Sequence, residues 1–212
     1  MFNHTLWLRL AAVLVLLSQS AAAQEIGRGS LLISTDALAG TLFEETVLLI
    51  VHHDDDGSIG IMINRPTNLA PVDVFPDLEG AGSYTGVLFF GGPLTPGRPF
   101  LIARRADALA DSAIRIADDV YLSGDVSLLR GLEEAQRDGS FSRIYAGSAQ
   151  WGPGQLQGEV DAGAWETTLA SPGDVFYEAP EKLWRRLLDA PHGTDTARRE
   201  ADSGSEMRLA AQ

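Results

Sequence analysis

Cysteine is absent from the 212 residues, which excludes disulfide bonds, thiolate metal sites, a thiol nucleophile and a lipid-modified N-terminal cysteine. Histidine is scarce, with four in the chain, so chemistry that needs an imidazole has few places to occur. Cations are also few, because 16 Lys and Arg residues stand against 29 Asp and Glu residues and the formal net charge is −13. Since such a chain repels phosphate backbones and anionic lipids, we expect no nucleic acid among its partners.

Long apolar runs are missing as well. A membrane span needs about 20 consecutive apolar residues, and no run in the sequence reaches that length. A shorter run at residues 10–17 follows Arg9 and precedes the small residues 21–23. This order of parts is typical of a signal peptide, so residues 1–23 are predicted to be removed after Ala23. The protein is then periplasmic or secreted and keeps no transmembrane segment, and a retained N-terminal anchor is the alternative.

The rest of the chain is predicted to form one domain and a tail. Residues 24–190 are enough to bury the hydrophobic core of a single domain. Residues 191–212 lose the apolar periodicity and gain Gly, Ser and mixed charge, which is typical of a flexible tail. Strands and helices follow one another without strict alternation, so the α+β class is expected.

A dense group of metal-ligand residues occurs in the stretch VHHDDDG, residues 51–57. Apolar runs at residues 46–51 and 59–64 flank it, and Gly57 supplies the positive φ that a hairpin turn needs, so we predict two buried strands joined by a turn. A metal site needs at least three converging ligands, whereas adjacent His52 and His53 on a strand point to opposite faces. A metal site made by His52, His53 and Asp54 is therefore the weaker alternative.

Further elements follow from the apolar pattern and from the turn residues. Strands are predicted at residues 86–90, 99–103, 143–149 and 165–169, with a strand pair inside residues 113–123. Three helices are predicted. The first spans residues 125–139, the second has Pro153 in its first turn, and the third runs from Pro180 to Ala190.

Three stretches contain candidate binding residues, each with a structural alternative. Arg65 could hold a carboxylate or phosphate in bidentate fashion, or pair with one of the many acids. The glycines of GGP at residues 91–93 offer backbone amides to an anion, or make a sharp turn, and no Lys-Ser/Thr follows as in a P-loop. Trp151, beside two glycines and a proline, suits a small-ligand or peptide groove, or packs in the core. The candidate set is Asn64, Arg65, Gly91, Gly92, Pro93, Trp151, Gly152 and Gly154.

Four ordered blocks resemble the YqgE/AlgH family of bacterial proteins across residues 29–188. They are GSLLIS at residues 29–34 with FEETV at residues 43–47, GSIGIMINRP at residues 57–66, FFGGPL at residues 89–94, and WGPGQL at residues 151–156. The resemblance implies a compact domain with a bifurcated, barrel-like mixed sheet and flanking helices. It brings no established catalytic residues and no cofactor.

The sequence departs from the family pattern at several points. Asp36 and Gly40 stand where the family tends to have proline and aspartate, and Ser148 and Gln150 replace an expected tyrosine and small residue. The predicted signal peptide is a third departure, because family members are more usually cytoplasmic. If these blocks line a functional surface, that surface is altered in this chain.

The pattern as a whole favours a non-enzymatic domain that binds a protein or a small ligand. It does not indicate the oligomeric state. Two alternatives remain at this point. Some family members are called transcriptional regulators, although the acidic chain lacks a convincing helix-turn-helix. A metal-assisted hydrolase would use the turn at His52, His53 and Asp54.

Overall fold

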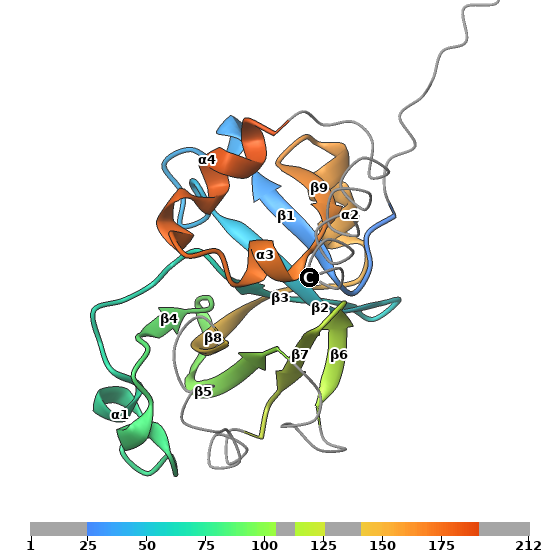
Figure 1. The fold of residues 1–212 in the computed structure, drawn as a ribbon. Coiled ribbons are helices and arrows are strands. Elements are labelled where there is room, and N and C mark those ends of the chain that lie inside the picture. The colour runs from blue at the N-terminus through green and yellow to red at the C-terminus, as the bar shows by residue number, and fades with distance from the viewer. Residues whose placement is uncertain (1–24, 105–112, 126–140, 191–212) are drawn as a thin grey trace, which may run out of the picture.

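The computed structural model describes residues 25–104, 113–125 and 141–190 (Figure 1). The predicted signal peptide, the helix predicted at residues 125–139 and the tail lie wholly or almost wholly outside these ranges. In the described part of the chain, none of the helices has the length and apolar character needed to cross a membrane.

The described residues form one strongly curled sheet with four short α-helices, which confirms the α+β class and the barrel-like mixed sheet. The helices are α1 (Pro71–Val74), α2 (Gln155–Asp161), α3 (Pro172–Val175) and α4 (Leu183–Leu188). The strands are β1 (Ser30–Ser34), β2 (Val47–Asp54), β3 (Gly57–Met62), β4 (Leu88–Phe90), β5 (Leu94–Ala103), β6 (Ile114–Ala117), β7 (Val120–Ser123), β8 (Ser142–Trp151) and β9 (Trp165–Leu169).

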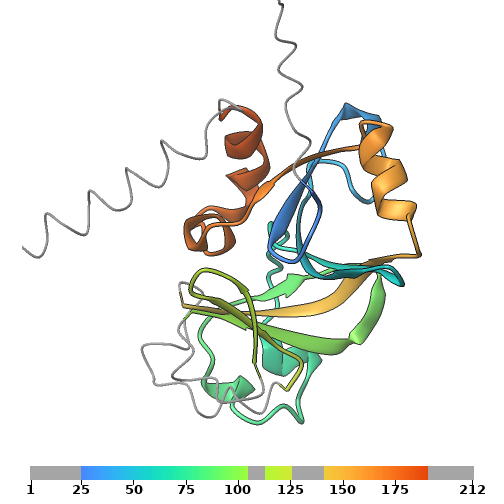
Figure 2. The ribbon, with the colours of Figure 1, turned by 90° about the vertical axis from the view of Figure 1, so that its right-hand side faces the viewer.

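Strand β8 is the junction of the sheet, whose order is β6-β7-β5-β8-β3-β2-β1-β9 with β4 added beside β8. It pairs antiparallel with β5 and β3 and parallel with β4. Figures 1 and 2 show the β1–β2–β9 part of the sheet turned away from the β5–β6–β7 part, with α3 and α4 on one side of β1 and α2 on the other. The curl therefore creates apolar layers on both faces of β1 and β2.

The continuous apolar runs of β1 and β2 follow from this double burial. Leu31 and Leu49 pack into the core that contains α3 and α4, whereas Leu32 and Leu48 face the opposite core, which contains Trp151. All four leucines are fully buried. A strand that is covered on both faces shows no alternation of apolar and polar residues, as the sequence of β2 indicated.

A buried cation joins β8 to the C-terminal helices. Arg143 is 3% exposed and donates hydrogen bonds to the carbonyl oxygens of Val175 (2.8 Å) and Tyr177 (2.7 Å). Its guanidinium also lies 4.9 Å from the ring centroid of Phe89 and 5.7 Å from that of Phe176. These contacts satisfy the charged group and fix the segment that includes α3 against the sheet.

Most predicted elements are present, with shifted boundaries. The hairpin of β2 and β3 is confirmed, and Gly57 has a φ of +140°. Strand β2 extends through Asp54, and β5 begins at Leu94, five residues before the strand predicted to start at residue 99. The expectation that Pro153 lies in the first turn of a helix is wrong, because Gly154 is the N-cap of α2.

Tyr145 gives a pH-dependent test of the core. Its side chain is fully buried, and its hydroxyl makes no hydrogen bond within the described part of the chain. Burial raises the pKa of Tyr145 to about 12, while the Arg143 guanidinium lowers it more weakly. Because the folded-state pKa lies above the ordinary value of 10.0, the ionisation of Tyr145 costs no stability below pH 10, and the protein loses stability through this group as the pH rises from 10 toward 12.

We therefore expect Tyr145→Phe to lose less unfolding free energy than the wild type between pH 10 and about 12. At neutral pH the variant should be equal in stability or up to about 1 kcal/mol more stable, because it removes a buried hydroxyl without a hydrogen bond. Urea denaturation of both proteins over this pH range measures the effect. The same pH slope in both proteins would contradict the assignment.

Candidate functional site

The turn end of the β2–β3 hairpin, residues 52–56, is solvent-exposed, and its polar groups pair locally. His52 Nε2 lies 2.9 Å from Asp54 Oδ2, and His53 Nδ1 lies 2.7 Å from Ser58 Oγ. The backbone N–H of Asp56 donates to Asp54 Oδ1 at 2.9 Å, and this bond is the main cause of the lowered pKa of the Asp54 carboxyl. Within the described ranges, no group of three or more His, Asp or Glu side chains has the arrangement of a metal site.

Two neighbouring clefts share Thr41 and Leu42 in their linings, and the side chain of Leu42 is exposed. We call them the Arg65 cleft and the tryptophan cleft. Their volumes of about 530 and 490 Å³ fall in the range of small-ligand sites. The Arg65 cleft is lined by Thr41, Leu42, Glu44, Glu45, Arg65, Pro66, Thr67 and Phe90. The tryptophan cleft is lined by Leu38, Thr41, Leu42, Phe43, Pro93, Leu94, Ala149, Gln150, Trp151, Gln155, Glu159 and Trp165.

The wall segment, residues 36–45, is held in place by two residues that follow β3. Asn64 is 4% exposed, and its side chain donates to the carbonyl oxygen of Glu45 and accepts from the N–H of Val47, both at 2.9 Å. Arg65 Nη2 donates to the carbonyl oxygen of Glu44 and, at 3.0 Å, to Thr46 Oγ1. Glu45 has a φ of +49°, a left-handed conformation that is uncommon outside glycine, so these bonds fix an unusual turn.

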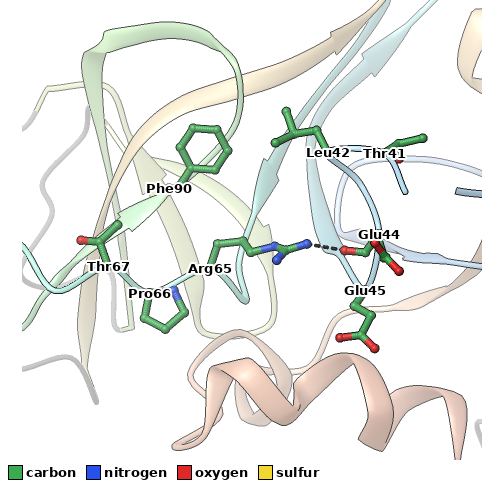
Figure 3. Close-up of a pocket in the computed structure, with 8 residues that line it drawn as sticks. All are labelled: Thr41, Leu42, Glu44, Glu45, Arg65, Pro66, Thr67 and Phe90. Atoms are coloured by element: carbon green, nitrogen blue, oxygen red, sulfur yellow. Dashed lines mark hydrogen bonds between the residues drawn. The ribbon is translucent and has the colours of Figure 1, made fainter. Parts of the chain in front are cut away.

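Figure 3 shows the Arg65 cleft between the Thr41–Glu45 segment on one side and Arg65, Pro66 and Thr67 on the other, with Phe90 from β4. The Arg65 guanidinium binds a carbonyl oxygen and a hydroxyl. None of the described ion pairs includes Arg65. Its other nitrogens make none of the described hydrogen bonds, so they have donors to offer to a ligand.

The tryptophan cleft contains a fixed carboxylate. Trp151 Nε1 donates to Glu159 Oε2 at 2.9 Å, and Trp165 Nε1 donates to the same oxygen at 3.0 Å. Gln155 Nε2 donates to Glu159 Oε1, also at 3.0 Å. The two indole rings pack edge to face with centroids 6.3 Å apart, and Phe43 packs edge to face on Trp165 at 5.7 Å. These contacts tie α2 to β8 and β9 and leave the cleft mostly apolar.

The GGP stretch approaches β8 closely through its backbone. Gly91 accepts a hydrogen bond from the N–H of Met62 and donates one to the carbonyl of Ala146, both at 2.8 Å. Gly92 has a φ of +151°, and a Cβ there would overlap the backbone of Ser148. The backbone of Gly91 and Gly92 is therefore part of the sheet junction, and Pro93 alone of the three residues lines a cleft.

Comparison with known proteins decides the family. The AlgH-like family model matches residues 31–194. The chain belongs to the AlgH-like family.

Its relatives are similar over most of their length. A UPF0301 protein of Streptomyces avermitilis is 40% identical over 165 residues, which cover 76% of this chain and 84% of that protein. A UPF0301 protein of Cytophaga hutchinsonii is 31% identical over 167 residues, which cover 78% of this chain and 90% of that protein. The solution structure of the AlgH protein from Pseudomonas aeruginosa superimposes with a TM-score of 0.64 at 25% identity, covering 82% of this chain and 93% of that one. The crystal structure of DIP2367 from Corynebacterium diphtheriae, with a TM-score of 0.63 at 24% identity, has the same fold.

The structure brings only some of the candidate residues to one place in this AlgH-like domain. Arg65 lines one cleft, and Pro93 and Trp151 line the other. Asn64, Gly91 and Gly92 lie behind the clefts as scaffold. Gly152 and Gly154 are exposed at the start of α2 outside both linings.

Sequence reasoning missed several residues that line the tryptophan cleft: Leu42, Phe43, Gln155, Glu159 and Trp165. Phe43 lies in a block that resembles the family, and this was a signal for a role of the wall segment. No local pattern could show that Glu159 lies between two tryptophans, because that arrangement depends on how α2 packs. Among the departures from the AlgH-like pattern, Gln150 lines the tryptophan cleft, whereas Ser148 is 1% exposed.

Gly92→Ala tests the close approach of the GGP stretch to β8. The new Cβ meets backbone atoms that no side-chain rotation can move, and φ is positive, so we expect a loss of about 2–4 kcal/mol in unfolding free energy. Gly97→Ala is the matched control, because its Cβ meets nothing within 4 Å and a change within about 0.5 kcal/mol is expected. Urea denaturation measures both, and equal effects at the two glycines would contradict this account.

Proposed function

We propose that this AlgH-like protein is a non-enzymatic binding domain whose ligand or partner occupies the groove formed by the Arg65 cleft and the tryptophan cleft. The observation that carries the proposal is the shared wall at Thr41 and Leu42, which makes the two clefts one continuous surface. A ligand that spans both would contact a cation at one end and an aromatic, acid-containing cleft at the other.

The character of the linings supports binding. The tryptophan cleft is mostly apolar, with a few polar groups in fixed positions, which is the usual composition of a site that recognises a ligand by shape. Arg65 is held by two hydrogen bonds through a single nitrogen, so its position is set before a ligand arrives. The exposed histidines of the β2–β3 hairpin line neither cleft.

Leu42 is the position from which to capture an occupant, because it is 51% exposed and belongs to both linings. We expect p-benzoylphenylalanine at position 42 to form a discrete covalent adduct on irradiation of cells. The same photoreactive residue at Ile114, which is 48% exposed on β6, is the control and should give no such adduct. The same adducts at both positions, or none at position 42, would count against the groove.

We also propose that the domain acts after export, in the periplasm or outside the cell. The support is the order of parts at the N-terminus, with Arg9, the apolar run of residues 10–17 and the small residues that end at Ala23.

The protein can be purified through a C-terminal tag from an extracytoplasmic fraction. Under denaturing conditions, we expect its mass to be that of a chain that begins at Gln24. Native mass spectrometry of the same sample, prepared without added metal, would show any retained ligand or second subunit as extra mass. A full-length chain that begins at Met1 and is found in the cytoplasm would contradict export.

A further inference from the structure

Among the described residues that line the tryptophan cleft, Glu159 alone is charged, and its described hydrogen bonds all come from neutral donors. Of the described ion pairs, none includes Glu159. A half-buried carboxylate in an apolar cleft gains from a cation at short range, because water screens the charge less there. The cleft therefore has a negative charge in place for which the described residues provide no cation.

The number of acceptor positions narrows the kind of cation. A carboxylate offers about four lone-pair positions. The two indole N–H groups bind Oε2, and Gln155 binds Oε1, so one position remains, on Oε1. A guanidinium prefers two parallel acceptors, whereas an ammonium group is a compact charge that one acceptor can bind.

The rest of the lining suits an apolar stem behind that ammonium group. Leu42, Phe43 and Leu94 lie on the same cleft, and Leu42 and Leu94 are 51% and 44% exposed. Lysine side chains bury their methylene stem along apolar surface and keep the charged end at a polar group. The net charge of −13 also attracts a basic partner at long range.

We propose that the tryptophan cleft binds a lysine side chain of a partner polypeptide, with the ammonium group on Glu159 Oε1 and the stem along Leu42, Phe43 and Leu94. This inference rests on the proposed groove and names the chemistry of its occupant. The wall shared with the Arg65 cleft lets the partner backbone continue past Leu42.

The test uses three blocked amino acids, N-acetyl methylamides of lysine, norleucine and arginine. Each is titrated into the protein while the Nε–H resonances of Trp151 and Trp165 are followed by NMR. Because one ion pair at a partly exposed site contributes modestly, we expect the lysine probe to bind about fivefold more tightly than norleucine. Arginine should bind more weakly than lysine.

Glu159→Gln keeps an acceptor oxygen and removes the charge, so the preference for lysine over norleucine is expected to disappear. Asp161→Asn is the matched control, because it removes the same charge from the same helix outside the cleft and should keep the preference. If Glu159→Gln does not fold, the ranking of the three probes on the wild type decides.

Norleucine or arginine binding as tightly as lysine would overturn the lysine assignment. Retention of the preference in Glu159→Gln would overturn the role of Glu159. If the three probes shift the indole resonances alike, the cleft binds ligands without selecting charge, and the proposed function stands. If none shifts them and position 42 gives no adduct, both proposals fail.

Discussion

The close approach of the GGP backbone to β8 is the constraint on which the rest of this fold depends. Strand β8 pairs with β3, β4 and β5, and the hydrogen bonds of Gly91 join this junction to Met62 in β3 and Ala146 in β8. Only a residue without a side chain fits at Gly92, because its backbone lies against Ser148. The next residue, Pro93, lines the tryptophan cleft, so this contact also sets where one side of that cleft lies.

Two polar residues that suggested ligand binding in the sequence also make structural contacts. Asn64 uses both ends of its amide to hold the wall segment, and Arg65 holds it through the carbonyl of Glu44. The wall in turn places Leu42 in the linings of both clefts. Scaffold and site are therefore not separate sets of residues in this domain, and a substitution at Asn64 would alter both clefts without touching a ligand.

The sequence predicted the parts of the fold that depend on local pattern. The run TVLLIV indicated a buried strand, and the aspartates before Gly57 indicated a turn, because turn chemistry and apolar runs are local properties. The site was predicted less well. Trp151 was singled out, but Glu159 and Trp165 reach it only through the packing of α2 against β8 and β9, which no spacing in the sequence shows.

The pairing of β1 with β9 has a consequence for when this domain can form. Ser30 pairs with Leu169, and the indole of Trp184 donates to the carbonyl oxygen of Ser34 at 2.8 Å, across 150 positions of sequence. Contacts of such long range close large loops and slow folding. During synthesis the first strand has one edge without its native partner until the last strand has left the ribosome. The sheet of this domain is therefore complete only at a late stage of synthesis. A chain that stops before β9 leaves β1 as an open sheet edge.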